Sequence, residues 1–397
     1  MESLSQRVKS LSPSATVAMY QKTRDLQAKG IDIINLGVGE PDFNTPDHVK
    51  AAAKKAIDDN FTFYPPVSGY PDLKKAIVEK FKRENNLDFT PEQIMVSTGA
   101  KQALANTLMV LIDKGDEVII PAPYWVSYIE LVKLCEGKPV VIEAKYENNF
   151  KITPAQLEKA ITPKTKAFLI CSPSNPSGAV YSGSELRAFA DILLRHERII
   201  TISDEIYEHI NFIGGHESIA QFPGLKDRIV IINGVSKAYA MTGWRIGYMG
   251  APLWIVKACD KLQGQMTTGA TTIAQKAAAA ALASGQECVA EMNRAFMRRK
   301  NLMVKLVRDI EGLKLYEPEG AFYIFPVVKY YLGKSVNGKK INTAADLCLY
   351  LIEEAHISTV PGEAFGDPDC IRISFANSDE NLVEAMRRMK EALAKMK

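Results

Sequence analysis

The sequence is organised around the stretch NGVSKAYAMTGWRIGY at residues 233–248. It overlaps the apolar run RIVIIN at 228–233, which predicts a buried β-strand. Lys237 follows that run among small and apolar residues, where an ammonium group is poorly solvated. Desolvation lowers the pKa of a lysine, so the free amine can attack a carbonyl carbon. Ser236 and Arg245 add a hydroxyl and a guanidinium, which together can hold a phosphate.

A lysine for an aldehyde, with a serine and an arginine for a phosphate, suits pyridoxal 5'-phosphate (PLP). The plainer interpretation is that Lys237 is a surface lysine and Arg245 a charge at a strand edge. The whole stretch, however, closely resembles the cofactor-lysine segment of the class I aminotransferases, in the aspartate aminotransferase family. The resemblance implies that Lys237 forms a Schiff base with PLP and moves the substrate proton as general base and acid.

Further segments that resemble this family occur in order along nearly the whole chain. They are YPPVSGYPDL (64–73), GDEVIIPAPYWVSY (115–128), SPSNPSG (172–178), SDEIYEHI (203–210), GAFYIF (320–325), VPGEAFG (360–366) and IRISFA (371–376). Unrelated chains do not share such a set. The chain looks most like the bacterial subgroup Ib, and the resemblance implies a PLP-dependent transferase of fold type I.

Length and composition exclude several classes of protein. The chain has 397 residues, enough for two or three domains, and its 47% hydrophobic content is typical of globular proteins. A net charge of +3 is too small to indicate nucleic acid or an acidic membrane surface as a partner. No apolar run approaches the roughly 18 residues of a membrane span, and the N-terminus has no apolar signal core. With scattered cysteines and no CxxC motif, we expect a cytoplasmic protein.

The pattern of apolar runs predicts an α/β protein. Between residues 94 and 250, short apolar runs alternate with helical patterns, as in a mostly parallel sheet covered on both faces. Later helices and strands predict a smaller α+β unit. The predicted strands include 31–36, 94–97, 117–121, 140–142, 166–171, 199–203, 230–233, 244–250, 320–326, 357–360 and 370–375. The predicted domains are an arm at 1–12, a small domain at 13–46 and 293–397, and a large PLP-binding domain at 47–292.

Ligands of open α/β sheets bind at the carboxyl ends of the strands, so the residues that follow each predicted strand are candidates. Gly99, Ala100 and Lys101 follow the strand at 94–97 and begin a helix. Small residues there let backbone N–H groups approach an anion, although a simple helix cap is the alternative. Because Ser236 and Arg245 add further anion-binding groups, we expect these residues to form a phosphate site.

Two further candidates, Trp125 and Asn175, also follow predicted strands. The flat indole of Trp125 can stack on a pyridine ring, although a core tryptophan is an equal alternative. Asn175 lies in the rigid turn SPSNPSG, where its amide either donates to the phenolic oxygen of PLP or only stabilises the turn. The resemblance places both residues against cofactor and substrate. The family usually reads SPNNPTG, so Ser174 and Ser177 depart from its pattern while Asn175 matches it.

Asp204 and Tyr207 follow the predicted strand at 199–203. A carboxylate there can bond a protonated pyridine nitrogen, which keeps the ring cationic and able to accept electrons. The alternative is that Asp204 caps a helix. The phenol of Tyr207 can reach the ring oxygen. We expect Asp204 and Tyr207 to act in catalysis together with Lys237.

Arg372 lies inside an apolar predicted strand, where an unpaired charge is costly. A buried guanidinium is best paired with a carboxylate, so Arg372 either forms an internal salt bridge or binds a ligand. The resemblance assigns it the α-carboxylate of the substrate, with Gly37 opposite. It also suggests that Lys101 and Thr16 meet a second, distal carboxylate.

Tyr64 resembles the tyrosine that reaches the cofactor phosphate of a neighbouring subunit in this family. If the role carries over, the protein is a homodimer with shared active sites. The alternative is a loop tyrosine packed at an interface.

These residues together predict an aspartate aminotransferase that acts on aspartate and 2-oxoglutarate. An aminotransferase for aromatic amino acids or prephenate, or a PLP lyase or synthase, is the alternative with the same cofactor. A PLP-fold binding or regulatory protein is the non-catalytic alternative, but such proteins usually lose the lysine or carry a DNA-binding segment. We predict no metal site.

Overall fold

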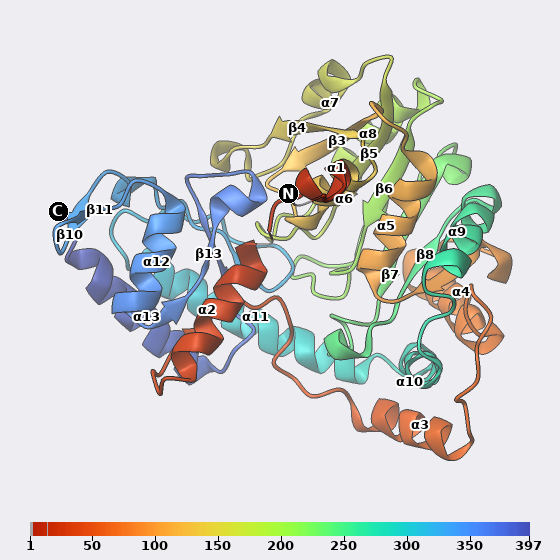
Figure 1. The fold of residues 1–397 in the computed structure, drawn as a ribbon, viewed down its shortest axis with the longest axis horizontal. Helices are drawn as coiled ribbons and strands as arrows, with labels where there is room; N and C mark the ends of the chain where they lie inside the picture. The colour runs from red at the N-terminus through yellow and green to blue at the C-terminus, as the bar shows by residue number, and fades with distance from the viewer. Residues whose placement is uncertain (1–2, 14) are drawn as a thin grey trace.

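A seven-stranded sheet forms the centre of the computed structural model, which describes residues 3–13 and 15–397. The strand order is β2-β8-β7-β6-β5-β3-β4 (Figure 1). The strands are β2 (Ile94–Ser97), β3 (Glu117–Ala122), β4 (Lys138–Glu143), β5 (Thr165–Cys171), β6 (Ile200–Asp204), β7 (Ile229–Gly234) and β8 (Gly247–Gly250). Parallel pairs join β7, β6, β5, β3 and β4, which agrees with the predicted mostly parallel sheet.

One strand, β8, runs against all the others, because it pairs antiparallel with both β2 and β7. The predicted strand at 244–250 was too long, because β8 begins only at Gly247. Residues Thr242–Trp244 form a 3-10 turn, and Arg245 has a left-handed backbone with φ of 59°, which ends any extended run before β8. The reversal places the start of β8, and not its end, at the edge where the parallel strands finish.

Helices cover both faces of the sheet (Figure 1). The helices of this larger region are α3 (Asp47–Asp58), α4 (Pro71–Asn85), α5 (Ala100–Leu111), α6 (Ser127–Leu134), α7 (Pro154–Ala160), α8 (Gly183–Leu194), α9 (Leu253–Met266) and α10 (Thr272–Ala283), of which α3 packs on α10. One core lies under α5, α6 and α9 and includes Leu104 and Ile202. The opposite face carries α4, α10 and α8. The sequence interpretation named no element at α4, although Leu73, Ile77 and Phe81 recur every four residues and are buried there.

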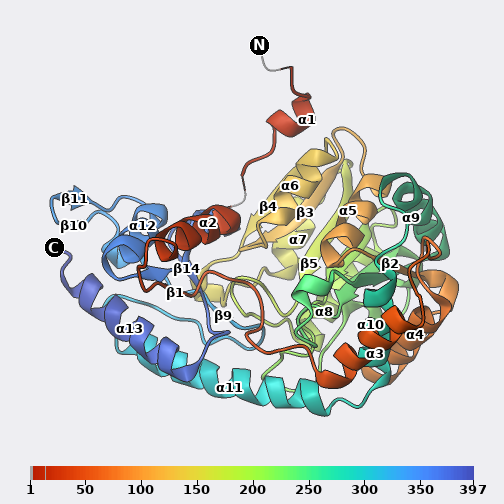
Figure 2. The same ribbon diagram turned by 60° about the horizontal axis from the view of Figure 1, so that its bottom comes forward.

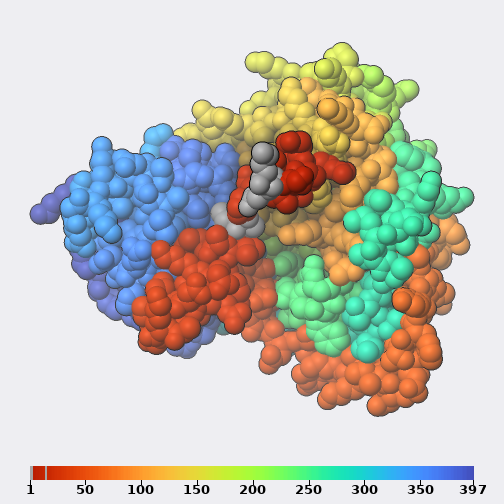
Figure 3. All heavy atoms as spheres, viewed as in Figure 1, coloured from red at the N-terminus to blue at the C-terminus, as the bar shows by residue number. Residues whose placement is uncertain are grey.

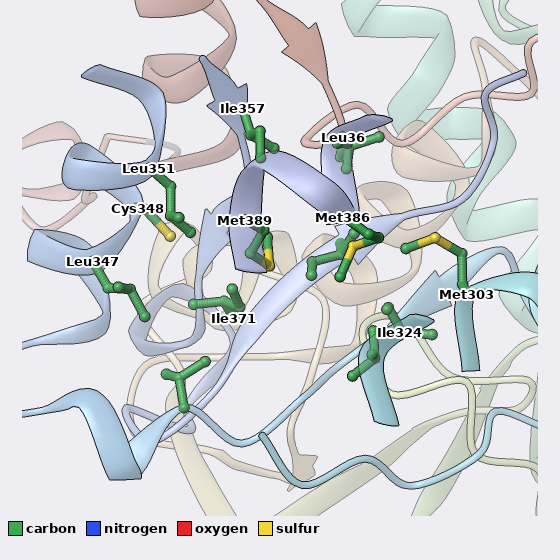
Figure 4. Close-up of a cluster of buried hydrophobic side chains, with 14 of the residues drawn as sticks. Leu36, Met303, Ile324, Leu347, Cys348, Leu351, Ile357, Ile371, Met386 and Met389 are labelled. Atoms are coloured by element: carbon green, nitrogen blue, oxygen red, sulfur yellow. The ribbon is translucent and has the colours of Figure 1, made fainter. Parts of the chain in front are cut away.

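A smaller region is built from both ends of the chain. Its helices are α2 (Ala15–Gln27), α11 (Glu287–Arg308), α12 (Ala344–Glu354) and α13 (Asp379–Ala394), and its strands are β1 (Ile34–Asn35), β9 (Tyr323–Ile324), β10 (Ser335–Val336), β11 (Lys339–Lys340), β12 (Ile357–Ser358), β13 (Val360–Pro361) and β14 (Ile371–Ser374). Figure 4 shows Leu36, from near the start of the chain, in the same buried cluster as Ile324, Ile371 and Met386. The predicted strands at 31–36 and 320–326 are shorter in the structure, where they correspond to β1 and β9. The predicted strand at 357–360 is divided into β12 and β13.

The strands of the smaller region pair across long sequence distances. β1 is parallel to β12, while β14 is antiparallel to both β13 and β9. The long helix α11 passes under both regions in Figure 2. The predicted domain boundary between residues 292 and 293 falls inside this continuous helix, so the domain division stays a prediction.

The short helix α1 (Gln6–Lys9) packs near α6, and the backbone N–H of Ser12 donates to Glu130 over 2.8 Å. Figure 3 shows α1 lying on the surface, near the place where the two regions meet. Met1 and Glu2 of the predicted arm at 1–12 lie outside the described residues. Among the described residues, no helix has the length and apolar character that crossing a membrane requires.

Candidate active site

A cavity of about 490 Å³ lies at the carboxyl-end edge of the parallel strands, between the sheet and the smaller region. The predicted site residues line it, except for Gly99 and Tyr64. The predicted residues among its lining are Thr16, Gly37, Ala100, Lys101, Trp125, Asn175, Asp204, Tyr207, Ser236, Lys237, Arg245 and Arg372. The structure therefore brings residues from most of the chain length into one place.

Lys237 follows β7 and directs its amine into the cavity. Its Nζ donates a hydrogen bond of 2.6 Å to the backbone carbonyl of Gly39. Burial lowers the pKa of Lys237 to about 8, and the positive charges of Arg372 and Arg245 act in the same direction against the opposing effect of Glu40. About a tenth of the amine is therefore neutral at pH 7, and the neutral fraction increases as the pH approaches 8.

Asp204 is the last residue of β6, and its carboxylate is held from two sides. The hydroxyl of Tyr128 donates to Oδ2 over 2.6 Å, and the backbone N–H of Ile206 donates to Oδ1 over 3.3 Å. Burial raises the pKa of Asp204 to about 6, although both hydrogen bonds oppose the increase. Between β6 and β7, where every residue is described, no α-helix forms, so Asp204 does not cap one.

Tyr207 lies one turn beyond Asp204, and its hydroxyl meets a partner that the sequence interpretation did not name. The Tyr207 and Tyr323 hydroxyl oxygens are 2.9 Å apart, and both side chains are buried. The ring centre of Tyr207 is 6.0 Å from the Nζ of Lys237. The phenol thus lies beside the reactive amine.

Arg372 enters the cavity from β14 in the smaller region. Its Nη1 donates to Oδ1 of Asn175 over 3.1 Å, and its Nη2 donates to the carbonyl of Gly37 over 2.7 Å. The guanidinium lies 4.5 Å from the ring centre of Tyr323 and 4.9 Å from that of Phe365. Stacking between two rings fixes its plane.

The positive charge of Arg372 has no acidic partner among the described residues. Its Nε is buried and makes no hydrogen bond there. Burial lowers the pKa of this arginine, because the charged form is poorly solvated. The internal salt bridge considered from the sequence does not form, and the guanidinium can accept an anionic ligand from the cavity.

The groups proposed for a phosphate lie close together around the start of α5. A Cβ on Gly99 would lie 2.3 Å from Nη2 of Arg245, and one on Gly247 would lie 2.1 Å from the backbone nitrogen of Ala100. Only glycine therefore allows β8 and the guanidinium to approach this helix. Ser236 is buried and also lines the cavity. The N-terminus of α5, a hydroxyl and a guanidinium form a suitable anion site.

Trp125, Lys101 and Thr16 also line the cavity. Trp125 is half-buried, and its ring lies edge-on to Tyr128 with 5.5 Å between the ring centres. The Nζ of Lys101 lies 4.9 Å from the centre of the Trp125 ring. Burial and the charge of Arg245 lower the pKa of Lys101. Thr16 comes from the start of α2, in the smaller region.

Tyr64 lies outside the cavity and is 92% exposed in the single chain. Its predicted role requires a second copy of the chain, so it stays a prediction.

Three contributors to the site were missed from the sequence: Tyr128, Tyr323 and the carbonyl of Gly39. Tyr128 and Tyr323 lie in the segments PYWVSY and GAFYIF, and each contacts a predicted catalytic residue. In both segments an aromatic residue in an apolar run looks like an ordinary core position, so only the structure reveals the contact.

Comparisons with known proteins agree with this arrangement. The family model "Aminotransferase class I and II" matches residues 31–389. A probable aspartate/prephenate aminotransferase of Rhizobium leguminosarum is 49% identical over 98% of both chains. An aspartate aminotransferase of Geobacillus stearothermophilus is 47% identical over 98% of this chain and 100% of its own.

Solved structures show the same fold. The aspartate aminotransferase of Rhizobium meliloti superposes with a TM-score of 0.96 at 45% identity and covers 100% of both chains. The Thermus thermophilus enzyme, solved with maleate, gives a TM-score of 0.93 at 40% identity, over 99% of this chain and 100% of its own.

Proposed function

The chain belongs to the family of class I and II aminotransferases, and on this premise we propose that it transfers the amino group of L-aspartate to 2-oxoglutarate. The products are oxaloacetate and L-glutamate. The observation that carries the proposal is the buried Arg372, which has no acidic partner among the described residues and lies in the same cavity as Lys237 and Asp204. Full-length relatives named aspartate aminotransferase support the choice of substrate.

The family implies PLP as the cofactor, and the residues present fit it. Lys237 offers an amine of lowered pKa for the aldehyde, and Asp204 offers a buried carboxylate for the pyridine nitrogen. Ser236, Arg245 and the start of α5 suit the phosphate. The closeness of Gly247 to the nitrogen of Ala100 keeps this seat compact. Trp125 offers a flat face, and Asn175 and Tyr207 offer polar groups for the phenolic oxygen.

Bound PLP supplies an aldehyde and a cationic ring that stabilises negative charge on a substrate carbon. Lys237 then removes the proton from the substrate α-carbon and returns it to the product, which suits an amine with a pKa of about 8. Asp204 keeps a proton on the ring nitrogen. Burial has raised the pKa of Asp204 to about 6 because the buried carboxylate is poorly solvated, so a cationic ring nitrogen next to this carboxylate is strongly favoured.

Arg372 orients the substrate by binding its α-carboxylate through two parallel hydrogen bonds. In the single chain its N–H groups use Asn175 and Gly37 as acceptors, and a carboxylate would provide a charged acceptor in their place or beside them. Lys101 and Thr16 line the same cavity and suit a distal carboxylate. Two carboxylate-binding positions favour a dicarboxylic substrate such as aspartate.

Prephenate or an aromatic amino acid is the second candidate substrate. Several relatives with about half of their residues identical are named aspartate/prephenate aminotransferase. The Nζ of Lys101 rests over the Trp125 ring and is not fixed by an acidic partner among the described residues. A lysine held this way can move aside for a ring.

We also propose a homodimer with shared active sites. Tyr64 and the nearby Phe63 are 92% and 79% exposed, which is unusual for two neighbouring aromatic residues. The resemblance to the family gives Tyr64 the cofactor phosphate of such a second copy as its partner.

The test is an absorption spectrum of the purified protein loaded with PLP, recorded after adding aspartate and then 2-oxoglutarate. We expect a visible band that bleaches with aspartate and returns with 2-oxoglutarate. The Lys237→Ala variant should show neither change, with turnover at least about 10³-fold lower. Bleaching by phenylalanine and not by aspartate would contradict the proposed substrate, and a complete absence of the band would contradict the cofactor.

A further inference from the structure

Tyr323 is a buried tyrosine at the contact between the two regions of the molecule. It belongs to β9 in the smaller region, has no exposed surface, and lies 2.9 Å through its hydroxyl from the hydroxyl of Tyr207. Tyr207 follows β6 in the sheet region. A pair of phenols therefore joins the two regions inside the cavity.

The same side chain contacts two other parts of the site. Its ring centre is 4.5 Å from the guanidinium carbon of Arg372, whose strand β14 pairs with β9 through Ser374 and Tyr323. Its hydroxyl also lies against Gly39, where an added Cβ would be only 2.8 Å away. The carbonyl of Gly39 accepts the hydrogen bond from Lys237. Tyr323 thus touches the surroundings of the amine, the guanidinium and the phenol.

The two hydroxyls have one hydrogen each, so the direction of their bond decides what Tyr207 can offer to a ligand. The guanidinium beside the Tyr323 ring makes this phenol the better donor, because a nearby positive charge stabilises the anionic side of an O–H bond. If Tyr323 donates, the hydrogen of Tyr207 stays free to point into the cavity. Hydrogen bonds in such a chain strengthen one another.

On the basis of the proposed function, we propose that Tyr323 is a positioning residue whose hydroxyl donates to Tyr207 and thereby makes Tyr207 a directed, stronger donor to the phenolic oxygen of PLP. Since Tyr323 and Arg372 lie on paired strands, the placement of the smaller region sets both contacts together. Binding of the substrate carboxylate and tuning of the cofactor are then coupled through one rigid element.

The effect appears in the pH dependence of the visible absorption of the PLP-loaded protein. A donor on the phenolic oxygen withdraws charge from it, so the nitrogen of Lys237 joined to the cofactor releases its proton at lower pH. Loss of the Tyr323 hydroxyl should raise the midpoint of this pH titration by about half a pH unit, which is the size expected for one indirect, neutral hydrogen bond. The affinity of the PLP-free protein for PLP should fall about threefold.

The experiment compares Tyr323→Phe, Tyr207→Phe and the double variant by spectroscopic titration and by PLP binding to the PLP-free protein. Tyr350→Phe is the matched control, because it removes a buried hydroxyl in the smaller region that donates to the carbonyl of Ala392, far from the cavity. We expect a rise in the midpoint for Tyr323→Phe, a larger rise for Tyr207→Phe, and none for the control.

The double variant decides whether Tyr323 acts through Tyr207. If it does, adding Tyr323→Phe to Tyr207→Phe causes no further shift, since the intermediate hydroxyl is already gone. A wild-type midpoint in Tyr323→Phe, or shifts that simply add, would overturn the inference. Failure of the wild-type protein to bind PLP or to bleach with any amino acid would instead contradict the proposed function.

Discussion

Replacing Asp204 by asparagine should stabilise the PLP-free protein while damaging its function. Asp204 is 3% exposed, and its pKa is raised from 3.8 to about 6 by burial. The folded state therefore holds the proton more tightly than the unfolded chain. For this group alone, the free energy of unfolding is highest below the unfolded pKa, falls as the pH rises towards about 6, and stays low above it.

The size of this change in the free energy of unfolding follows from the shift in the pKa of Asp204. A rise of about two pKa units at about 1.4 kcal/mol each corresponds to roughly 3 kcal/mol of destabilisation at neutral pH. Asparagine removes this charge but has one oxygen for the two donors, Tyr128 and Ile206, so it loses about 1 kcal/mol of hydrogen bonding. We therefore expect Asp204→Asn to raise the free energy of unfolding by about 2 kcal/mol near pH 8.

Urea denaturation of the PLP-free wild-type and variant proteins measures this difference. Near pH 4 the advantage of Asp204→Asn should disappear, since the wild-type carboxyl is then protonated in the folded state. Asp88→Asn is the control, because Asp88 is an exposed carboxylate paired with Lys82 on the surface, so its substitution should leave the free energy of unfolding close to that of the wild type at both pH values. An Asp204→Asn variant no more stable than wild type near pH 8 would refute the electrostatic reasoning.

Three other predictions follow from the site. Arg372→Lys should raise the KM for aspartate about 10²-fold in steady-state assays, because an ammonium group replaces a guanidinium that can make two parallel hydrogen bonds to a carboxylate. An unchanged KM would contradict carboxylate binding at Arg372. Tyr128→Phe removes a donor that lowers the pKa of Asp204, so PLP affinity should begin to weaken at a higher pH than in the wild type, for which we expect the decrease near pH 6. A fluorescence titration across pH would show this, and coincident profiles would argue against it. Gly247→Ala places a Cβ 2.1 Å from the backbone nitrogen of Ala100, so the protein should unfold at a lower temperature and bind PLP more weakly. Wild-type PLP affinity in this variant would show that the backbone at the phosphate site can move to make room for the methyl group.

Much of the fold and site could be predicted because the informative residues lie at the ends of apolar strands. Asp204 ends β6 and Lys237 follows the neighbouring parallel strand β7, so a shared sheet edge brings them together without any detailed knowledge of packing. Arg372 was conspicuous because a charge interrupts an apolar run. Such signals depend on a few adjacent residues, and these are what a sequence displays directly.

The remaining features depend on contacts between distant segments. Tyr128 and Tyr323 look like core aromatics until their partners, Asp204 and Tyr207, are placed beside them. The late start of β8 follows the left-handed backbone at Arg245, a conformation that residues other than glycine seldom adopt, and its reversed direction appears only when its partners β2 and β7 are in place. Local patterns carry little information about either feature.

The pairing of β1 with β12 also affects the order in which parts of the protein can fold during synthesis. Ile34 pairs with Ile357, so the first strand to leave the ribosome has no partner until most of the chain has been translated. The seven strands of the large sheet all emerge before residue 251 and can assemble earlier. A nascent chain at that stage already carries the reactive lysine but not Arg372. Until synthesis is nearly complete, the apolar sides of α2 and β1 remain uncovered, and they are natural places for a chaperone to bind.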